Sequence, residues 1–472
     1  MSKQNSHIQC PRVGLLGLTL ELYEDLAPGL REGREKWVCE EVLPALSQFA
    51  DVDFSGACYR RSDVEQTLER FENMSVDAIL VMLLTYSPSQ IALPGLRRTS
   101  LPMLIWNTQE LPAVDESFTS EQMTQNHGVH GTQDLANVLV RSGVEFEYVT
   151  SHLSDPDPLA EVKDFFRAAA AVRRLRETSV GLLGYPFVGM GDFAVDTTHL
   201  TATLGCEWKQ IPMSEYLQRS RRTDPARVDR LIESYRNDYE VAEDIDEDDL
   251  AATARADLAL RQIVAEGSLD ALTYQFQAFG EEPETETVPF VGISRLMAEG
   301  IGFGGEGDIL GAAATSFLDS LQSPAGFSEI FTIDFGGNAL LMSHMGEANP
   351  ALQRSDRKPR MVCRSPITET SAGQLVLKVS PEPGPATLFS LATGPNQTWR
   401  LIAGRVTIPD FGPLDALDVP HFKLRPDGDV REFLTAYATA GGPHHNAVCL
   451  GDARQRIRMA AQILDAEYIE VQ

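Results

Sequence analysis

The sequence predicts an α/β protein that begins with a doubly wound parallel sheet and ends in an antiparallel, barrel-like β structure. Over residues 1–176, short β-rich runs alternate with segments of helical apolar spacing, which is typical of βαβ units. From about residue 325 the runs are short, β-rich and separated by glycine, proline and asparagine turns. The length of 472 residues exceeds what one hydrophobic core usually serves, so we expect several domains.

The N-terminal domain is expected over residues 1–176. Apolar runs such as RVGLLGL and VDAILVMLL predict strands, and apolar residues spaced three and four apart predict helices. The predicted strands are 12–18, 50–54, 76–84, 102–106 and 145–149. The predicted helices are 30–48, 62–74, 88–96, 131–142 and 158–176. No GxGxxG sequence follows the first strand, so the pattern does not support dinucleotide binding.

An α/β middle domain is expected over residues 177–324. Its predicted strands are 179–185 and 270–276, and its predicted helices are 194–204, 225–237, 249–266, 290–299 and 307–321. The acidic run 240–249 is interpreted as a solvated approach to a helix that an aspartate caps. The run 281–289 is expected to be an exposed loop.

The β-rich C-terminal domain is expected over residues 325–472. Its strands are predicted by the runs EIFTIDF, NALLMSH, QLVLKVS, ATLFSLA and WRLIAGRVTI, with the last strand at EYIEV. Helices are predicted at 429–438 and 452–462. The short strands and turn residues indicate an antiparallel sheet or barrel.

Charge and composition restrict the function. The formal net charge of −28 argues against nucleic acid or an anionic membrane as partner, because both would repel the chain. The apolar fraction of 43% and charged fraction of 23% are ordinary for a soluble globular protein. The N-terminus has no run of about 18 apolar residues and no secretory signal pattern. The six cysteines are spread singly and form no CxxC pair, so we expect reduced thiols in a cytoplasmic protein.

Two glutamates stand where a side chain can enter a cleft. Glu306 follows a glycine-rich turn at the start of a predicted helix, and glycine permits backbone conformations that direct such a side chain. The alternative is that Glu306 and Asp308 only complement the helix dipole. Glu329 opens a predicted strand, and strand alternation directs Asp334 to the opposite face unless a bulge intervenes.

Five of the nine histidines fall in three short windows: His127 and His130, His344, and the pair His444–His445. His344 shares a strand face with apolar residues, so a core role is the alternative. If His444 and His445 enter a strand, their side chains point in opposite directions and at most one is a ligand. Carboxylates with imidazoles form a mixed oxygen and nitrogen set, which suits Mn²⁺, Mg²⁺ or Co²⁺. Cys449 is a less favoured ligand, because a thiolate would select zinc.

Several blocks of the sequence resemble the L-arabinose isomerase family, within the arabinose/fucose isomerase group. The strongest are GFGGEGDILGAAA, SEIFTIDF with SHMGEANP, and GGPHHN. Weaker similarity runs through NTQELP, QNHGVHG, VGMGDFAVD and LTYQF. These blocks occur in order over nearly the whole chain. The resemblance implies a Rossmann-like first domain, an α/β middle domain and a β-rich third domain.

The resemblance also implies site residues. The implied metal ligands are Glu306, Glu329, His344 and His445, with Mn²⁺ as the cofactor and the two glutamates as the catalytic acid/base pair. The implied sugar-binding residues are His130, His127, Met190, Phe276 and His444, with His127 where the family commonly has glutamine. The family further implies a homo-oligomer, a trimer or hexamer, whose active site is shared between subunits.

Departures from the family concern sugar recognition. The first strand continues into GLTLELYED, where the family usually has a G-S-Q-H-L-Y-G segment. Asp334 replaces a histidine, and the segment between Phe276 and Glu306 is a few residues longer. We therefore expect a metal-dependent aldose–ketose isomerase of a free monosaccharide, L-arabinose-like, acting through a cis-enediol. The alternatives are an isomerase of another aldose such as fucose or galactose, a metal-dependent epimerase or lyase, and a non-enzymatic sugar-binding relic.

Overall fold

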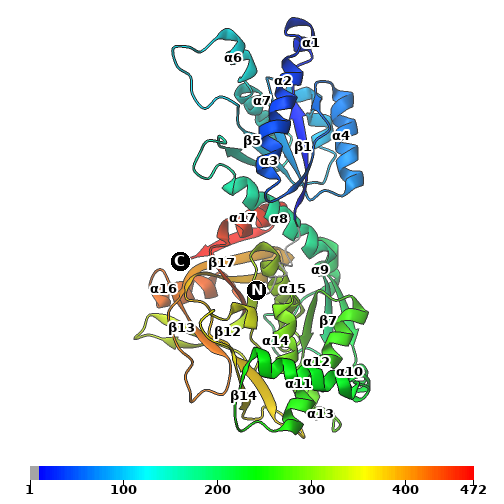
Figure 1. The fold of residues 1–472 in the computed structure, drawn as a ribbon, viewed down its shortest axis with the longest axis vertical. Helices are drawn as coiled ribbons and strands as arrows, with labels where there is room; N and C mark the ends of the chain where they lie inside the picture. Colours follow the sequence, from blue (N-terminus) through cyan, green and yellow to red (C-terminus); the bar gives the residue numbers. More distant parts are fainter. Residues whose placement is uncertain (1–9) are drawn as a thin grey trace. The chain divides into compact units, whose positions relative to one another are not determined.

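The structure, a computed structural model, describes residues 10–472 (Figure 1). The first nine residues of the predicted N-terminal domain lie outside this range. The described chain divides into two compact units, residues 10–173 and Arg174–Gln472. Each unit is described by itself. Within residues 10–472, no helix is long and apolar enough to cross a membrane.

The N-terminal unit is built on a parallel sheet of order β2-β1-β4-β5-β6, with β3 also paired to β1. Its strands are β1 (Arg12–Leu18), β2 (Asp51–Asp53), β3 (Ala57–Cys58), β4 (Ala78–Leu83), β5 (Met103–Asn107) and β6 (Glu147–Thr150). All six residues of β4 are buried, which is why this strand is a continuous apolar run in the sequence. The predicted parallel sheet is confirmed.

The helices of this unit connect the strands. They are α1 (Leu22–Leu26), α2 (Leu30–Trp37), α3 (Leu43–Leu46), α4 (Arg61–Met74), α5 (Leu93–Leu96), α6 (Ser120–Gln125), α7 (Val129–Arg141) and α8 (Ala160–Glu177), which continues into the second unit. Short π and 3₁₀ turns lie at Val38–Val42 and Ser89–Ile91. The sequence pattern missed α1 and α6, which bury none of their residues and so have no apolar stripe.

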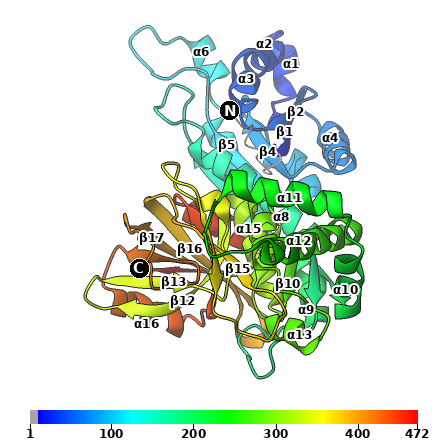
Figure 2. The same ribbon diagram turned by 60° about the horizontal axis from the view of Figure 1, so that its bottom comes forward.

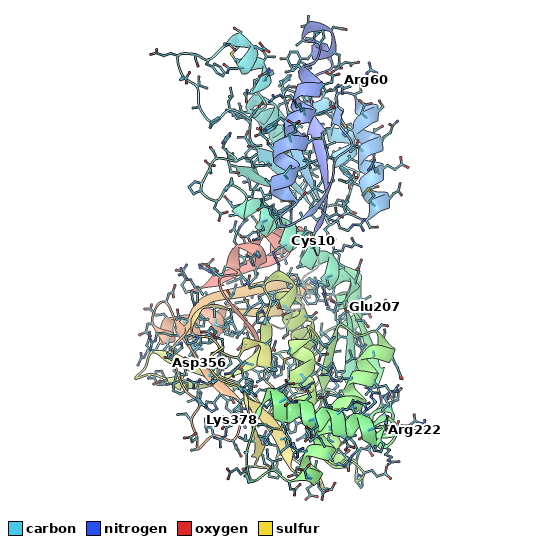
Figure 3. The ribbon with its side chains drawn as sticks, viewed as in Figure 1. Cys10, Arg60, Glu207, Arg222, Asp356 and Lys378 are labelled. Carbon is cyan, nitrogen blue, oxygen red and sulfur yellow. The ribbon has the colours of Figure 1, made fainter. Side chains whose placement is uncertain are left out.

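The second unit begins with a four-stranded parallel sheet of order β11-β10-β7-β8. Its strands are β7 (Ser179–Leu183), β8 (Glu207–Ile211), β10 (Ala271–Tyr274) and β11 (Gly302–Gly304). Its helices are α9 (Thr197–Leu204), α10 (Met213–Arg221), α11 (Pro225–Asp238), α12 (Glu247–Gly267), α13 (Phe276–Glu281), α14 (Phe290–Ala298) and α15 (Ile309–Leu321). Glu207, labelled in Figure 3, opens the edge strand β8, which is mostly exposed and was not predicted.

Two expectations for this region have different outcomes. Asp246 caps α12 by accepting a hydrogen bond from Asp249 N at 2.8 Å, which confirms the capping aspartate. The exposed-loop prediction for 281–289 is wrong in its second half. Thr287 is 1% exposed, and its hydroxyl donates to Gly373 O at 2.8 Å. This hydrogen bond holds the segment against the backbone at Gly373.

The C-terminal part forms a closed barrel of six antiparallel strands, β16-β19-β12-β13-β18-β17, in which β17 pairs back to β16. The barrel strands are β12 (Ala325–Asp334), β13 (Ala339–Ser343), β16 (Gly384–Thr393), β17 (Trp399–Ile408), β18 (His421–Pro426) and β19 (His445–Leu450). β20 (Glu467–Val471) adds to β17 in parallel. The predicted antiparallel barrel is confirmed.

The remaining elements surround the barrel. β14 (Arg360–Arg364) and β15 (Gln374–Lys378) pair with each other and with β9 (Glu240–Val241) in a separate small sheet, so the predicted strand QLVLKVS lies outside the barrel. Helices α16 (Val430–Thr439) and α17 (Arg454–Ile463) agree with the predicted pair. Helix α15 contacts β10 and β11 of the parallel sheet and β12, β16 and β19 of the barrel (Figure 2). Helix α15 therefore packs between two layers, the parallel sheet and the barrel.

Candidate active site

Glu306 lies in the turn between β11 and α15, at the carboxyl end of the parallel sheet. It has φ +59° and Gly307 has φ +85°, so two consecutive residues are left-handed. For a residue other than glycine this conformation costs about 1–3 kcal/mol, and such strain concentrates at functional sites. The turn is held by Phe187 N, which donates to Glu306 O at 2.8 Å. Glu306 is only 4% exposed.

Gly305 permits this turn to approach the barrel. A Cβ atom at Gly305 would lie 2.6 Å from His344 Cε1, closer than two carbon atoms can pack. Only glycine therefore lets the backbone pass directly beside the His344 imidazole. The turn brings the Glu306 side chain to the same side of the barrel as that histidine.

The barrel register brings Glu329 between two histidines. Glu329 on β12 pairs with His445 on β19 and with Ser343 on β13, and His344 follows Ser343 directly. Phe327 stands two residues before Glu329, and its ring contacts both imidazoles edge-on, with centroids 4.7 Å from His344 and 5.0 Å from His445. Three neighbouring strands thus supply one carboxylate and two imidazoles to one face.

A carboxylate holds the Nδ1 atom of each of the three histidines. His344 Nδ1 lies 2.6 Å from Glu347 Oε2, His445 Nδ1 lies 3.0 Å from Asp308 Oδ2, and His444 Nδ1 lies 2.5 Å from Asp192 Oδ2. In the neutral form of each imidazole, the carboxylate accepts the Nδ1 proton and the Nε2 atom keeps its lone pair. Metal-binding histidines are oriented by such partners.

The Nε2 atoms of His344 and His445 are buried and have no hydrogen-bond partner. His445 Nε2 lies 3.6 Å from Glu306 Oε2 and 3.8 Å from Glu329 Oε2. His344 Nε2 lies 3.8 Å from Glu329 Oε2. Buried polar atoms are normally hydrogen-bonded, so two unpartnered imidazole nitrogens facing two carboxylates indicate a place for a cation.

The geometry gives two overlapping groups that could hold a metal ion. One consists of Glu306, His444 and His445, the other of Glu329, His344 and His445, and the candidate ligand atoms within each group lie within 4.8 Å of one another. All four ligands that the resemblance implies are therefore brought together around His445. Cys449 is in neither group, and burial raises the pKa of its thiol to about 12.

The charges of the site depend on one another. Burial alone would raise the pKa of Glu306, but the nearby imidazoles of His444, His445 and His344 outweigh it and lower this pKa to about 2. Burial would lower the pKa of His445, but its contacts with Asp308 and Glu306 raise it to about 9. The site thus stabilises positive charge among ionised carboxylates, which is what a divalent cation requires.

The expectation that His444 and His445 point in opposite directions is wrong. Their ring centroids are 4.1 Å apart, and His444 Nε2 lies 3.8 Å from Glu306 Oε2. Strand alternation does not apply, because β19 begins at His445 and His444 belongs to the preceding turn. His444 is half-exposed, so it lies at the open side of the group.

Phe276 and Met190 belong to the same unit as the metal-ligand candidates. Phe276 begins α13 directly after β10, and its ring lies 6.4 Å from that of Phe187, next to the Glu306 turn. Met190 lies in the loop between β7 and α9, two residues before Asp192, which holds His444. Both residues follow the carboxyl ends of parallel strands, where open α/β sheets bind ligands.

His127 and His130 belong to the N-terminal unit. Tyr23 Oη lies 2.7 Å from His127 Nε2, and His130 stacks on Tyr86 with centroids 4.8 Å apart. The two imidazoles are 5.1 Å apart. Burial, and next the charge of His130, lower the pKa of His127. The structure describes these contacts within that unit alone.

Sequence reasoning missed the carboxylates that hold the histidines. Asp308 was weighed only as a dipole-complementing residue, and Glu347 and Asp192 were not singled out. One signal was available for Glu347, which stands three residues after His344 in the block SHMGEANP. No local signal marks Asp192, because it is 252 residues away from His444 along the chain.

Known proteins are similar to this chain over most of its length. Models of the N-terminal, central and C-terminal domains of L-arabinose isomerase match residues 45–177, 183–323 and 324–467. The L-arabinose isomerase of Acidothermus cellulolyticus is 26% identical over 406 residues, covering 83% of this chain and 79% of that protein. The enzyme of Nocardioides sp. is also 26% identical, covering 83% and 80%. That of Thermotoga maritima is 25% identical over 420 residues, covering 85% and 83%.

These matches follow one another in sequence order and include every block around the candidate ligands. Glu306 lies in the central-domain match, and Glu329, His344 and His445 lie in the C-terminal match. The chain belongs to the L-arabinose isomerase family and is a sugar isomerase.

Proposed function

We propose that this chain is a metal-dependent aldose–ketose isomerase that acts on a free monosaccharide, L-arabinose or a close relative, through a cis-enediol. Membership of the family supports the reaction class. The observation that carries the metal dependence is the pair of buried, unpartnered Nε2 atoms of His344 and His445, which face the carboxylates of Glu306 and Glu329.

The donor set fits a hard or intermediate divalent cation. Two carboxylates with two imidazoles suit Mn²⁺, which we propose as the metal, with Mg²⁺ and Co²⁺ as alternatives. Glu306, Glu329, His344 and His445 would hold it, and His444 stands beside them. Such a cation, when bound, stabilises negative charge that develops on sugar oxygens.

Glu306 and Glu329 are the proposed acid/base pair. The isomerisation removes the proton on C2 of the aldose and returns a proton to C1, while a second group moves the hydroxyl proton. The two carboxylates approach the site from opposite layers, Glu306 from the parallel sheet and Glu329 from the barrel. A sugar between them would have a carboxylate near each reacting carbon. The rings of Phe327 and Phe193 pack against the imidazole of His445.

The proposed sugar-binding residues are His444, Phe276 and Met190 with His130 and His127 of the N-terminal unit. We propose a cytoplasmic homo-oligomer, a trimer or hexamer, in which His130 serves the site of a neighbouring subunit. Mixing two inactive variants, Glu306→Gln and His130→Ala, tests this sharing. Activity that returns in the mixture supports it, because hybrid oligomers then contain some intact sites, and a mixture as inactive as its components contradicts it.

The proposed domain division is 1–176, 177–324 and 325–472, with a Rossmann-like doubly wound first domain. Three successive family models with boundaries near 177 and 324 support it. The strand order β2-β1-β4-β5-β6 is also compatible with a doubly wound sheet. Separate expression of residues 177–472 tests the first boundary, since this part should fold without residues 1–176 if the boundary is correct.

The decisive experiment uses protein stripped of metal by a chelator. Aliquots with and without Mn²⁺ are incubated with L-arabinose, L-fucose or D-galactose, and ketose is measured. We expect ketose from at least one aldose with Mn²⁺ and none without it. Mn²⁺-loaded protein that forms no ketose from any aldose would contradict the proposal. Product from a ketose with no aldose formed would indicate an epimerase or lyase instead.

A further inference from the structure

Tyr274 connects the two layers of the site through a buried hydrogen bond. It is the last residue of β10, in the parallel sheet that carries Glu306, and it is 1% exposed. Its hydroxyl donates to Glu347 Oε1 at 2.7 Å. Glu347 follows β13 of the barrel, 73 residues further along the chain, and is 3% exposed. The hydroxyl of this buried tyrosine thus links the parallel sheet to the segment that follows β13 of the barrel.

Glu347 transmits this contact to His344. Its second oxygen, Oε2, accepts from His344 Nδ1 at 2.6 Å and from Gly346 N at 3.0 Å. Within residues 10–472, the Tyr274 hydroxyl is the hydrogen-bond donor to Oε1. Donors on both oxygens fix the buried carboxylate in one orientation. Its Oε2 atom then accepts the Nδ1 proton of His344, which fixes the imidazole tautomer.

We infer that Tyr274 is a positioning residue for the isomerase reaction: through Glu347 it fixes the ring and tautomer of His344, so that Nε2 presents its lone pair to the site. This inference rests on the proposed metal-dependent function. Without the hydroxyl, Glu347 Oε1 is a buried acceptor without its donor, and the carboxylate gains freedom to turn. This freedom weakens the hold on Nδ1.

The chain offers a matched control for Tyr274→Phe. Tyr216 belongs to the same buried cluster and is 2% exposed. Both rings pack edge-on against Phe279, with centroids 5.4 Å away for Tyr274 and 5.1 Å for Tyr216. Tyr216→Phe removes an equally buried hydroxyl from the same packing environment without touching Glu347. Any effect of general loosening should therefore appear equally in both variants.

The first measurement is the dissociation constant of Mn²⁺ by electron paramagnetic resonance on metal-stripped full-length protein. Loss of an outer partner of a metal-binding histidine typically costs about 10- to 100-fold in affinity. We expect Tyr274→Phe to bind Mn²⁺ at least about 10-fold more weakly than wild type, and Tyr216→Phe to differ by less than about twofold. Equal weakening in both variants, or wild-type affinity in Tyr274→Phe, overturns the inference.

The second measurement requires no metal. Long-range ¹H–¹⁵N spectra of histidine-labelled protein report which ring nitrogen carries the proton, with His344→Gln used to assign the signal. Wild type and Tyr216→Phe are expected to show His344 protonated at Nδ1, and Tyr274→Phe to show a mixture of forms. An unchanged His344 signal in Tyr274→Phe overturns the inference alone. Wild-type protein that binds no Mn²⁺ overturns the proposed metal dependence and this inference together.

Discussion

His445 Nδ1 lies 3.0 Å from Asp308 Oδ2, while Asp308 Oδ1 accepts from Gly311 N at 2.7 Å and caps helix α15. One carboxylate thus both starts the helix between the two layers and orients a candidate metal ligand. The two contacts use different oxygens of the same carboxylate.

Asp308→Asn separates these two roles. Asparagine caps helices as well as aspartate does, so the melting temperature should stay close to that of wild type. The amide cannot accept the His445 proton with the same charge, so Mn²⁺ affinity should fall about 10- to 100-fold. Asp429→Asn is the control, because Asp429 caps α16 by accepting from Arg431 N, away from the metal ligands. Wild-type Mn²⁺ affinity in Asp308→Asn would show that Asp308 only caps the helix.

Gly305→Ala tests the close approach of the Glu306 turn to His344. The added Cβ must displace the imidazole, because it would lie 2.6 Å from Cε1. Overpacking of this kind costs about 1–3 kcal/mol, and the displaced ring should reduce turnover more than tenfold. Thermal unfolding and ketose formation measure the two effects. Gly412→Ala is the control, since an added Cβ there meets nothing within 4 Å. Equal behaviour of the two variants would contradict the prediction.

Glu306→Gln should abolish most of the activity while preserving the fold. The amide keeps the size of the side chain but can neither take up a proton nor provide charge for the cation, and acid/base groups typically contribute about 10²- to 10⁴-fold. The rate of ketose formation with saturating Mn²⁺ measures the loss. Glu207→Gln, at the exposed start of β8, is the control (Figure 3). Turnover within tenfold of wild type would remove Glu306 from the catalytic pair.

The stability of the C-terminal part should depend on pH through His421. This buried imidazole donates from Nδ1 to Val419 O at 2.8 Å and accepts at Nε2 from Leu414 N at 2.7 Å, and the acceptor role of Nε2 requires the neutral form. Burial lowers its pKa below the ordinary value of 6.5. The unfolded state therefore binds the proton more readily. The contribution to stability is complete above about pH 6.5 and is lost as the pH falls toward the lowered folded-state pKa.

Denaturant unfolding at pH 7.5 and 5.5 measures this dependence. Wild type should lose more unfolding free energy between the two pH values than His421→Gln, whose side chain does not titrate. The comparison is made between pH values within each protein, so a general loss of stability in the variant cancels. Identical pH dependence in the two proteins would exclude His421 as the source.

The parts of the fold that the sequence pattern predicted well are those whose burial is regular. β1 is a continuous apolar run and was predicted over its observed range of Arg12–Leu18. The edge strand β8 was missed because its sequence EWKQI is largely exposed and so has no apolar pattern. The spacing of apolar residues in a sequence reflects which side chains are buried. An element with few buried side chains therefore has only a weak apolar pattern.

The residues of the candidate site were also predicted only in part from the sequence. The resemblance supplied Glu306, Glu329, His344 and His445, and the structure brings these four together. Glu347 stands three residues after the histidine that it holds, but Asp308 and Asp192 are far along the chain from theirs, so no local pattern contains their contacts. Asp192 reaches His444 only because the loop after β7 and the turn before β19 meet in the folded chain. The wrong orientation for the histidine pair came from applying strand alternation one residue before the strand begins.

Closure of the barrel has a consequence for how this protein can change over evolutionary time. A slip of β12 by one residue would turn Glu329 to the other face and part it from both histidines. The ring of paired strands resists this slip, because β12 is hydrogen-bonded on both sides and the ring has no free edge. Glu329 and His445, which lie in barrel strands, are thereby insulated from mutation in the connecting loops. Those loops can exchange residues and accommodate a different aldose while the isomerisation chemistry is inherited unaltered.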